Sequence, residues 1–184
     1  MLEQRPSVSG LPAKTTDVPQ PGSDASSPGD SPLEPIVASE LPSHQSATAR
    51  ASVVMNPSTA LSVARSEIAK GDVLGCARIA GIQASKRAAE LIPSALPTRV
   101  GGVVINFTVG QDRIDIEARV DAIDRIGVSM EALTACAVAA LTVYDMCKAS
   151  DRSMMIGGLA LVETTAGEGA SWRRAAVDEA STKL

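Results

Sequence analysis

The stretch that most constrains the fold runs from Ser129 to Ala149 and reads SMEALTACAVAALTVYDMCKA. It contains no Gly or Pro, and its apolar residues are spread over most of its circumference, which indicates one long helix in the core. Asp145 and Lys148 lie three residues apart near its C-terminal end and therefore share a face. Two interpretations remain open: a surface ion pair in which Lys148 also offsets the helix dipole, or a pair that takes part in catalysis.

The composition indicates one domain of ordinary size together with a tail. The chain has 184 residues, of which 45% are hydrophobic, and it contains one Trp, one Tyr and one Phe. The core is therefore expected to consist of Val, Ile, Leu, Ala and Met. The net charge is only −4 and the chain has no block of basic residues, so we expect no nucleic-acid partner.

The cysteine and histidine content argues against a metal site. Cys76, Cys136 and Cys147 lie within helical patterns and lack C-x-x-C spacing, and His44 is the only histidine. We expect small buried cysteines, no bound metal, no disulfide and a reducing compartment. No stretch approaches the length of a membrane-spanning helix, and no basic start precedes an apolar run. We therefore expect a cytoplasmic protein with no membrane partner.

Residues 1–48 differ sharply from the rest of the chain. They hold eight of the eleven prolines and carry two basic against six acidic residues. Such a segment buries too little apolar surface to offset its ordering entropy, so the sequence predicts a disordered Pro/Ser-rich acidic tail. The predicted folded domain spans residues 49–164, and residues 165–184 are predicted to be a flexible C-terminal tail.

The folded domain is predicted to alternate strands and helices. A short strand over 51–55 precedes a helix from Pro57 to about residue 69; Gly71 ends that helix and Asp72 caps the next one, over 73–91. Strict alternation over 113–120, preceded by an apolar strand over 103–109, predicts a hairpin. The long helix and a strand over 153–163, with a bulge at residues 157 and 158, follow. This order, β-α-α-β-β-α-β, predicts an α+β fold: a ferredoxin-like antiparallel sheet with helices on one face.

Two stretches carry a specific family resemblance. They are KGDVLGCARIAGIQASKRAAELIP over 70–93 and GVSMEALTACAVAALTVYDMCK over 127–148, with a weaker match over 154–161. They resemble the MoaC family, the cyclic pyranopterin monophosphate synthases of molybdenum cofactor biosynthesis. The resemblance covers about two thirds of the chain and excludes the N-terminal tail and roughly the last twenty residues.

The resemblance implies a reaction, a substrate and an assembly. Members of the family are lyases that convert a cyclic dihydro-GTP (3',8-cyclo-7,8-dihydro-GTP), made by a radical-SAM enzyme, into cyclic pyranopterin monophosphate and release pyrophosphate. It further implies an α+β fold, a hexamer built as a trimer of dimers with the active site at a subunit interface, and no resident metal or cofactor.

The resemblance also assigns site residues. The catalytic positions fall on Lys70, Asp145 and Lys148, and the substrate-binding positions on Met130, Glu131 and the loop residues Ser94, Ala95 and Leu96. Amines and a carboxylate can act as general acids and bases if burial shifts their pKa values, and lysines neutralise a triphosphate. Glu131 and Asp145 are separated by roughly 21 Å along one helix. A single reacting centre that uses both therefore needs a second subunit.

Several positions depart from the family pattern. The loop histidine of the family is Leu96 here, and leucine can neither transfer a proton nor donate a hydrogen bond. A family glutamate falls on Ser129, and the family motif Lys-Ser-Gly-Gly-Lys-Ser-Gly becomes ETTAGEG over 163–169. Three interpretations stay open: an active but divergent synthase, a catalytically impaired subunit, or an enzyme that carries out a related rearrangement on another nucleotide. The impaired subunit would act as a scaffold or complete an interface site in a mixed oligomer with an intact paralogue.

Overall fold

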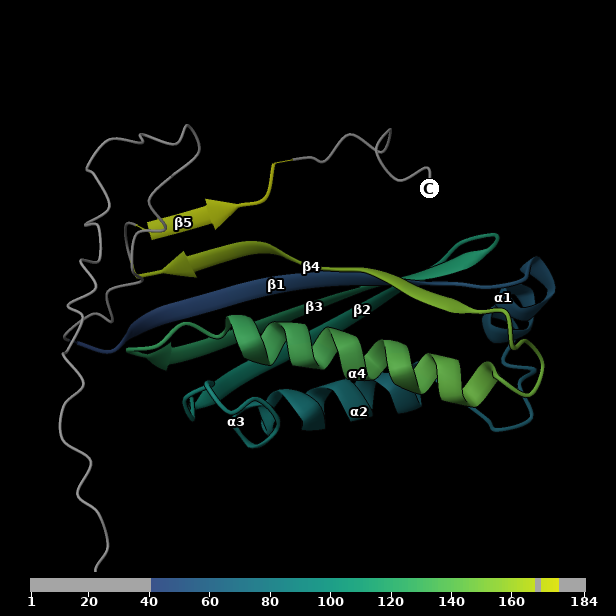
Figure 1. The fold of residues 1–184 in the computed structure, drawn as a ribbon, viewed down its shortest axis with the longest axis horizontal. Coiled ribbons are helices and arrows are strands. Elements are labelled where there is room, and N and C mark those ends of the chain that lie inside the picture. The colour runs from purple at the N-terminus through teal and green to yellow at the C-terminus, as the bar shows by residue number, and fades with distance from the viewer. Residues whose placement is uncertain (1–40, 168–169, 176–184) are drawn as a thin grey trace, which may run out of the picture. The chain divides into compact units, whose positions relative to one another are not determined.

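The computed structural model describes residues 41–167 and 170–175 of the chain. Its elements are β1 (Ser43–Val54), α1 (Pro57–Ala64), α2 (Val73–Ser85), α3 (Ala88–Leu91), β2 (Val100–Val109), β3 (Arg113–Asp124), α4 (Ser129–Cys147), β4 (Met155–Ala166) and β5 (Ala170–Arg173). The strands form one antiparallel sheet in the order β2-β3-β1-β4-β5. Figure 1 shows α2 and α4 on one face of this sheet. The α+β class is confirmed, and the order of β1 to β4 is consistent with a ferredoxin-like sheet.

Strand alternation separates the helix-covered face of the sheet from its polar face. In β3, Ile114, Ile116, Ala118 and Val120 are buried, whereas the residues between them are charged or exposed. In β1, which lies between β3 and β4, the buried apolar residues are Ala47, Ala49, Ala51 and Val53. Small alanines at the centre of the sheet let α4 pack closely on it, and the buried cluster joins both strands to α4.

The two long helices, α2 and α4, approach each other through small residues. Gly81 of α2 lies against α4: a Cβ at this position would stand 2.7 Å from the backbone oxygen of Ala135 and would overlap Ile105. Ala139 lies beside the same point. This contact fixes the distance between α2 and α4, and therefore the position of the loop that precedes α2 relative to the end of α4.

Several predicted boundaries differ from the observed ones. β1 begins at Ser43, so residues 43–48 belong to the sheet and not to the tail; among them, His44 lies 3.7 Å from Asp121 on β3. The first helix ends at Ala64, and the second divides into α2 and α3. At the C-terminal end, β4 continues to Ala166 and β5 follows, where the sequence predicts a flexible tail. The tail predicted for residues 1–40 lies outside the described residues.

Within the described part of the chain, α4 alone is long and apolar enough to cross a membrane, with 19 residues. The expectation that no stretch reaches this length is therefore wrong. More than half of the apolar window is buried against the sheet and α2, which makes α4 a core helix of the domain. The bulge predicted in the last strand is confirmed, because Gly158 has φ +64 and the β1–β4 register shifts beside it.

Candidate active site

Lys70 is held in place by the turn that joins α1 to α2. Gly71 adopts φ +98 and donates its backbone N–H to the carbonyl of Ile68 at 2.9 Å. The Asp72 side chain then accepts the N–H of Gly75 at 2.9 Å and caps α2. Asp is a preferred N-cap residue, and the predicted role of Asp72 is confirmed. The predicted role of Gly71 is wrong, because the first helix ends at Ala64; Gly71 instead takes a positive φ, which favours glycine, in the turn before α2. The turn directs Lys70 toward the C-terminal end of α4.

Lys70, Asp145 and Lys148 meet in one cluster. Lys70 Nζ lies 2.9 Å from Asp145 Oδ2 and 2.7 Å from the Asp145 backbone oxygen, and Lys148 Nζ lies 2.6 Å from Asp145 Oδ1. Each carboxylate oxygen therefore holds one ammonium group. All three side chains are between 44% and 56% exposed, so a ligand can reach them from solvent.

The charge of this cluster is set by pairing and not by burial. Hydrogen bonds from Lys148 and then Lys70 lower the pKa of Asp145 to about 2. The sequence-based expectation made catalysis depend on burial, whereas Asp145 is more than half exposed. A carboxylate with so low a pKa is a weak base at neutral pH, and it is well suited to holding two protonated amines in position.

A cavity of about 550 Å³ opens beside the cluster. Its lining residues are Lys70, Tyr144, Lys148, Ala149 and Arg152. Tyr144 is partly buried against the core and also lines this cavity. The sequence carries a signal for the position of Tyr144, because residues four apart share a helix face and Tyr144 therefore lies on the same face as Lys148. Arg152 lies beyond the helix end, where no periodic pattern marks it.

The loop that carries Arg152 is anchored by Asp151. This carboxylate is 3% exposed and accepts hydrogen bonds from the backbone N–H of Asn56 at 2.7 Å and the hydroxyl of Thr59 at 3.4 Å. Its other oxygen accepts the N–H and hydroxyl of Ser153 at 2.9 and 2.7 Å. These bonds, led by that from Asn56, lower the pKa of Asp151. Sequence reasoning missed this anchor because Asn56 and Thr59 are each more than ninety residues away from Asp151 in the chain.

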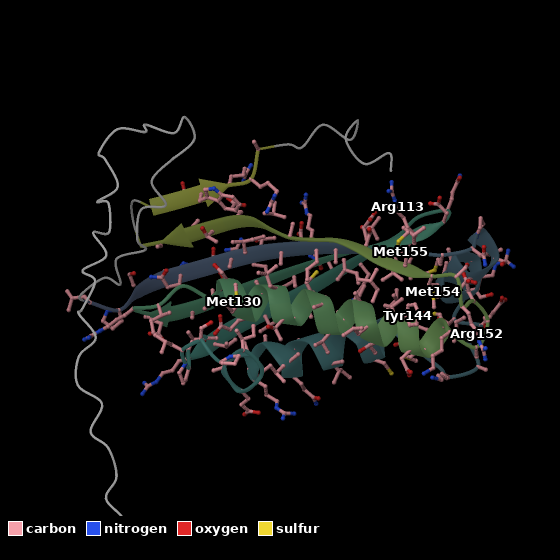
Figure 2. The ribbon with its side chains drawn as sticks, in the orientation of Figure 1. Arg113, Met130, Tyr144, Arg152, Met154 and Met155 are labelled. Atoms are coloured by element: carbon pink, nitrogen blue, oxygen red, sulfur yellow. The ribbon has the colours of Figure 1, made fainter. Side chains whose placement is uncertain are left out.

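The substrate-binding residues assigned by resemblance lie at the other end of α4. Figure 2 shows Met130 at one end of this helix and Tyr144 and Arg152 at the other. Glu131 is 3% exposed, and its carboxylate accepts a hydrogen bond from the Thr98 hydroxyl at 2.5 Å. That bond ties the loop containing Ser94, Ala95 and Leu96 to this end of the helix. Leu96 is 59% exposed.

The acidic residue at position 163 is neutralised locally. Glu163 lies 3.0 Å from Arg173 on β5, so its charge is paired with a cation of the neighbouring strand. This pair reduces the repulsion that an unpaired glutamate would exert on an anionic substrate. The second acidic departure, at position 168, lies outside the described residues.

The cysteines are free, and two of the three are buried. Burial raises the pKa of Cys136 to about 12 and also raises the pKa of Cys147, while Cys76 is exposed. Over residues 41–167 and 170–175, no three His, Cys, Asp or Glu side chains gather in a group that could hold a metal ion.

Sequence comparison relates this chain to one enzyme family. The sequence model of the MoaC family matches residues 37–167. The cyclic pyranopterin monophosphate synthase of Thermomicrobium roseum is 50% identical over 140 residues, which cover 75% of this chain and 84% of that protein. The proteins of the same name from Heliobacterium modesticaldum and Geobacter sulfurreducens are 47% and 43% identical over 130 and 140 residues. These matches cover 70% and 75% of this chain, and 82% and 88% of those proteins. The chain belongs to the MoaC family.

Proposed function

We propose that this chain is a cyclic pyranopterin monophosphate synthase, a lyase of molybdenum cofactor biosynthesis. Its substrate is 3',8-cyclo-7,8-dihydro-GTP, and its products are cyclic pyranopterin monophosphate and pyrophosphate. The observation that carries the proposal is the Lys70–Asp145–Lys148 cluster, with N···O distances of 2.9 and 2.6 Å, beside a cavity open to solvent. These are the positions to which the family resemblance assigns catalysis.

The cluster has the chemistry that the reaction needs. The rearrangement opens a purine-derived ring, moves protons and closes a cyclic phosphate with pyrophosphate as the leaving group. Ammonium groups can donate protons to nitrogen or oxygen of the substrate, and they offset the negative charge that accumulates as pyrophosphate departs. Asp145 holds Lys70 and Lys148 at fixed positions before the substrate arrives, which lowers the reorganisation needed during reaction.

The length of α4 favours a site shared between subunits. Glu131 and Asp145 are separated by roughly 21 Å along the helix axis, so one copy cannot offer both to one reacting centre. We propose a homo-oligomer, a hexamer arranged as a trimer of dimers, in which each site takes the Lys70–Asp145–Lys148 cluster from one protomer. Met130, Glu131 and the loop with Ser94, Ala95 and Leu96 come from another protomer. The proposal includes a cytoplasmic location, an upstream radical-SAM enzyme and no resident cofactor.

A second candidate follows from Leu96. A leucine at this exposed position cannot donate the proton that a histidine would, and an impaired subunit could then act as a scaffold or complete a mixed site with an intact paralogue. The two candidates differ in whether the chain turns over substrate by itself.

The decisive experiment is a turnover assay. Purified protein is incubated with 3',8-cyclo-7,8-dihydro-GTP, and pyrophosphate and cyclic pyranopterin monophosphate are quantified. Release of both products by this chain alone supports the proposed function. Activity that appears only after adding a family member with histidine in this loop, above the activity of that protein alone, supports the mixed oligomer. No turnover by this chain alone, together with no gain over the added family member in the mixture, contradicts both the synthase and the mixed site.

A further inference from the structure

Among the residues that the structure describes, three cations and no acid line the cavity beside the cluster. Lys70, Lys148 and Arg152 contribute the positive charge, while Tyr144 and Ala149 complete the wall. Asp145 shares its two carboxylate oxygens between the two lysines. Asp145 and Asp151, the carboxylate that precedes Arg152, carry two negative charges against the three cations, so one positive charge remains in excess and favours an anionic ligand.

Arg152 differs from the two lysines in its partners. Both ammonium groups are within 2.9 Å of Asp145, and Lys70 also donates to the Asp145 backbone oxygen. Within residues 41–167 and 170–175, Arg152 forms no ion pair and no side-chain hydrogen bond, and its side chain is exposed. Its donors are therefore available to a ligand, whereas part of the hydrogen-bonding capacity of each lysine is already used.

The backbone beneath Arg152 is fixed. Asp151, one residue earlier, is buried and holds Asn56, Thr59 and Ser153 through four hydrogen bonds of 2.7 to 3.4 Å. This anchor places the loop after α4 against the start of α1. A cation on a fixed backbone loses less freedom when it binds a ligand than one on a mobile loop.

We infer that Arg152 binds the phosphate chain of the nucleotide substrate, at the part that leaves as pyrophosphate. This inference rests on the proposed function for the identity of the substrate. The planar guanidinium matches phosphate oxygens in a bidentate arrangement, and it keeps its proton at physiological pH. Arg152 therefore anchors the anion without exchanging protons, and Lys70 and Lys148 are left to donate protons at the reacting atoms.

The test measures binding separately from turnover. Isothermal titration of the full chain with inorganic pyrophosphate compares wild type with Arg152→Gln and Arg152→Lys. The Gln variant loses two charge-assisted hydrogen bonds, so its affinity is expected to fall about tenfold or more. The Lys variant should keep part of the affinity. In the synthase assay, Arg152→Gln should raise KM by a similar factor and change kcat much less.

Arg113→Gln serves as the matched control. Arg113 is an exposed arginine on β3 whose neighbour Ile114 faces the helices, so Arg113 lies on the opposite side of the sheet from α4, away from Arg152 (Figure 2). Pyrophosphate affinity should match wild type in this variant. Both variants remove exposed side chains, and unchanged melting temperatures will verify that they fold.

Three results would overturn the inference: wild type that does not bind millimolar pyrophosphate, Arg152→Gln that binds as tightly as wild type, or an equal loss in Arg113→Gln. Failure of the proposed function leaves a different pattern. In that case Arg152→Gln still weakens pyrophosphate binding while wild type does not convert 3',8-cyclo-7,8-dihydro-GTP, so the anion site stands and the assigned reaction does not.

Discussion

The two ends of α4 carry different chemistry. At the C-terminal end, Asp145 and Lys148 meet Lys70 within 2.9 Å, beside a cavity that Arg152 also lines. At the N-terminal end, the Glu131 carboxylate is buried and engaged by Thr98, and the loop beside it presents Leu96 to solvent. Charged groups at the first end are assembled within a single chain. The second end offers a substrate few groups that can exchange a proton.

The two ends of α4 are also positioned by different kinds of contact. The C-terminal cluster depends on the α2–α4 contact at Gly81 and on the turn at Gly71, which are both internal to the domain. The N-terminal end depends on a loop that joins α3 to β2, and loops tolerate substitution more readily than packed helices. Substitutions in this loop therefore affect a reaction that needs both ends of α4 more than they affect the fold.

The largest effect is expected from Asp145→Asn. Without the carboxylate, the two ammonium groups lose their shared partner and repel each other, so turnover should fall about 10³-fold, within the range for loss of acid–base machinery. Initial rates of pyrophosphate release measure the change. Glu90→Gln is the matched control, because Glu90 is an exposed carboxylate paired with Arg87 at 2.8 Å. A loss confined to Asp145→Asn supports the comparison, and equal losses would contradict it.

Mixing two inactive variants tests whether the two ends come from different protomers. Asp145→Asn and Glu131→Gln each disable one end, and random mixed dimers contain one site with both ends intact. About a quarter of wild-type sites should be restored after joint refolding, a rise of roughly a hundredfold over either variant. Turnover after co-refolding, compared with simple mixing, provides the measurement. No recovery in co-refolded samples that still oligomerise would show that the ends are not shared.

Local patterns in the sequence predicted much of the fold. Alternation in β3 and the cap at Asp72 depend on residues close in the chain, and both are confirmed. The start of β1 was missed, because residues 43–48 are small and polar and resemble the tail. They form a strand since β3 and β4 supply hydrogen-bond partners on both sides.

The site was predictable only in part. Asp145 and Lys148 share a turn of α4, which the spacing reveals. Lys70 is 75 residues away from Asp145, and only the family resemblance joined them. The Asp151 anchor and Arg152 were missed because their surroundings are created by segments distant in sequence. Whether the three clustered side chains are catalytic stays a prediction.

Leu96→His would sharpen the comparison by returning a proton donor to the N-terminal end. Leu96 is 59% exposed, so an imidazole fits without repacking the core. If this donor alone limits the reaction, turnover should rise about a hundredfold, the lower end of the range for one acid–base group. The kcat of Leu96→His is compared with that of Leu96→Asn, which is polar but does not titrate. An equal or absent gain would mean that other loop substitutions also limit the rate.

Thr98→Val tests whether the loop is held by its bond to Glu131. The change is nearly isosteric and leaves a buried carboxylate without its 2.5 Å donor, which should destabilise the fold by about 1–2 kcal/mol. Urea unfolding measures the difference, and Thr98→Ser, which keeps the hydroxyl, is the control. Equal stability of the Val and Ser variants would show that this hydrogen bond does not hold the loop.

The smallest effect is the loss of fold stability at low pH, and it arises only at the C-terminal end of α4. The pKa of Asp145 is about 2 in the folded chain, whereas an unperturbed aspartate has a pKa of about 3.9, so pairing with Lys148 and Lys70 stabilises the fold above pH 4 and ceases to do so as pH falls through 2. The contribution is small because the three side chains are half exposed and solvent screens them.

The stability difference between wild type and Asp145→Asn should therefore shrink steadily from pH 5 to pH 2. Val143→Ala, at a fully buried position of the same helix, removes no ionisable group and should show a difference independent of pH. A wild-type advantage over Asp145→Asn that persists unchanged to pH 2 would mean that the carboxylate does not hold its two amines in solution.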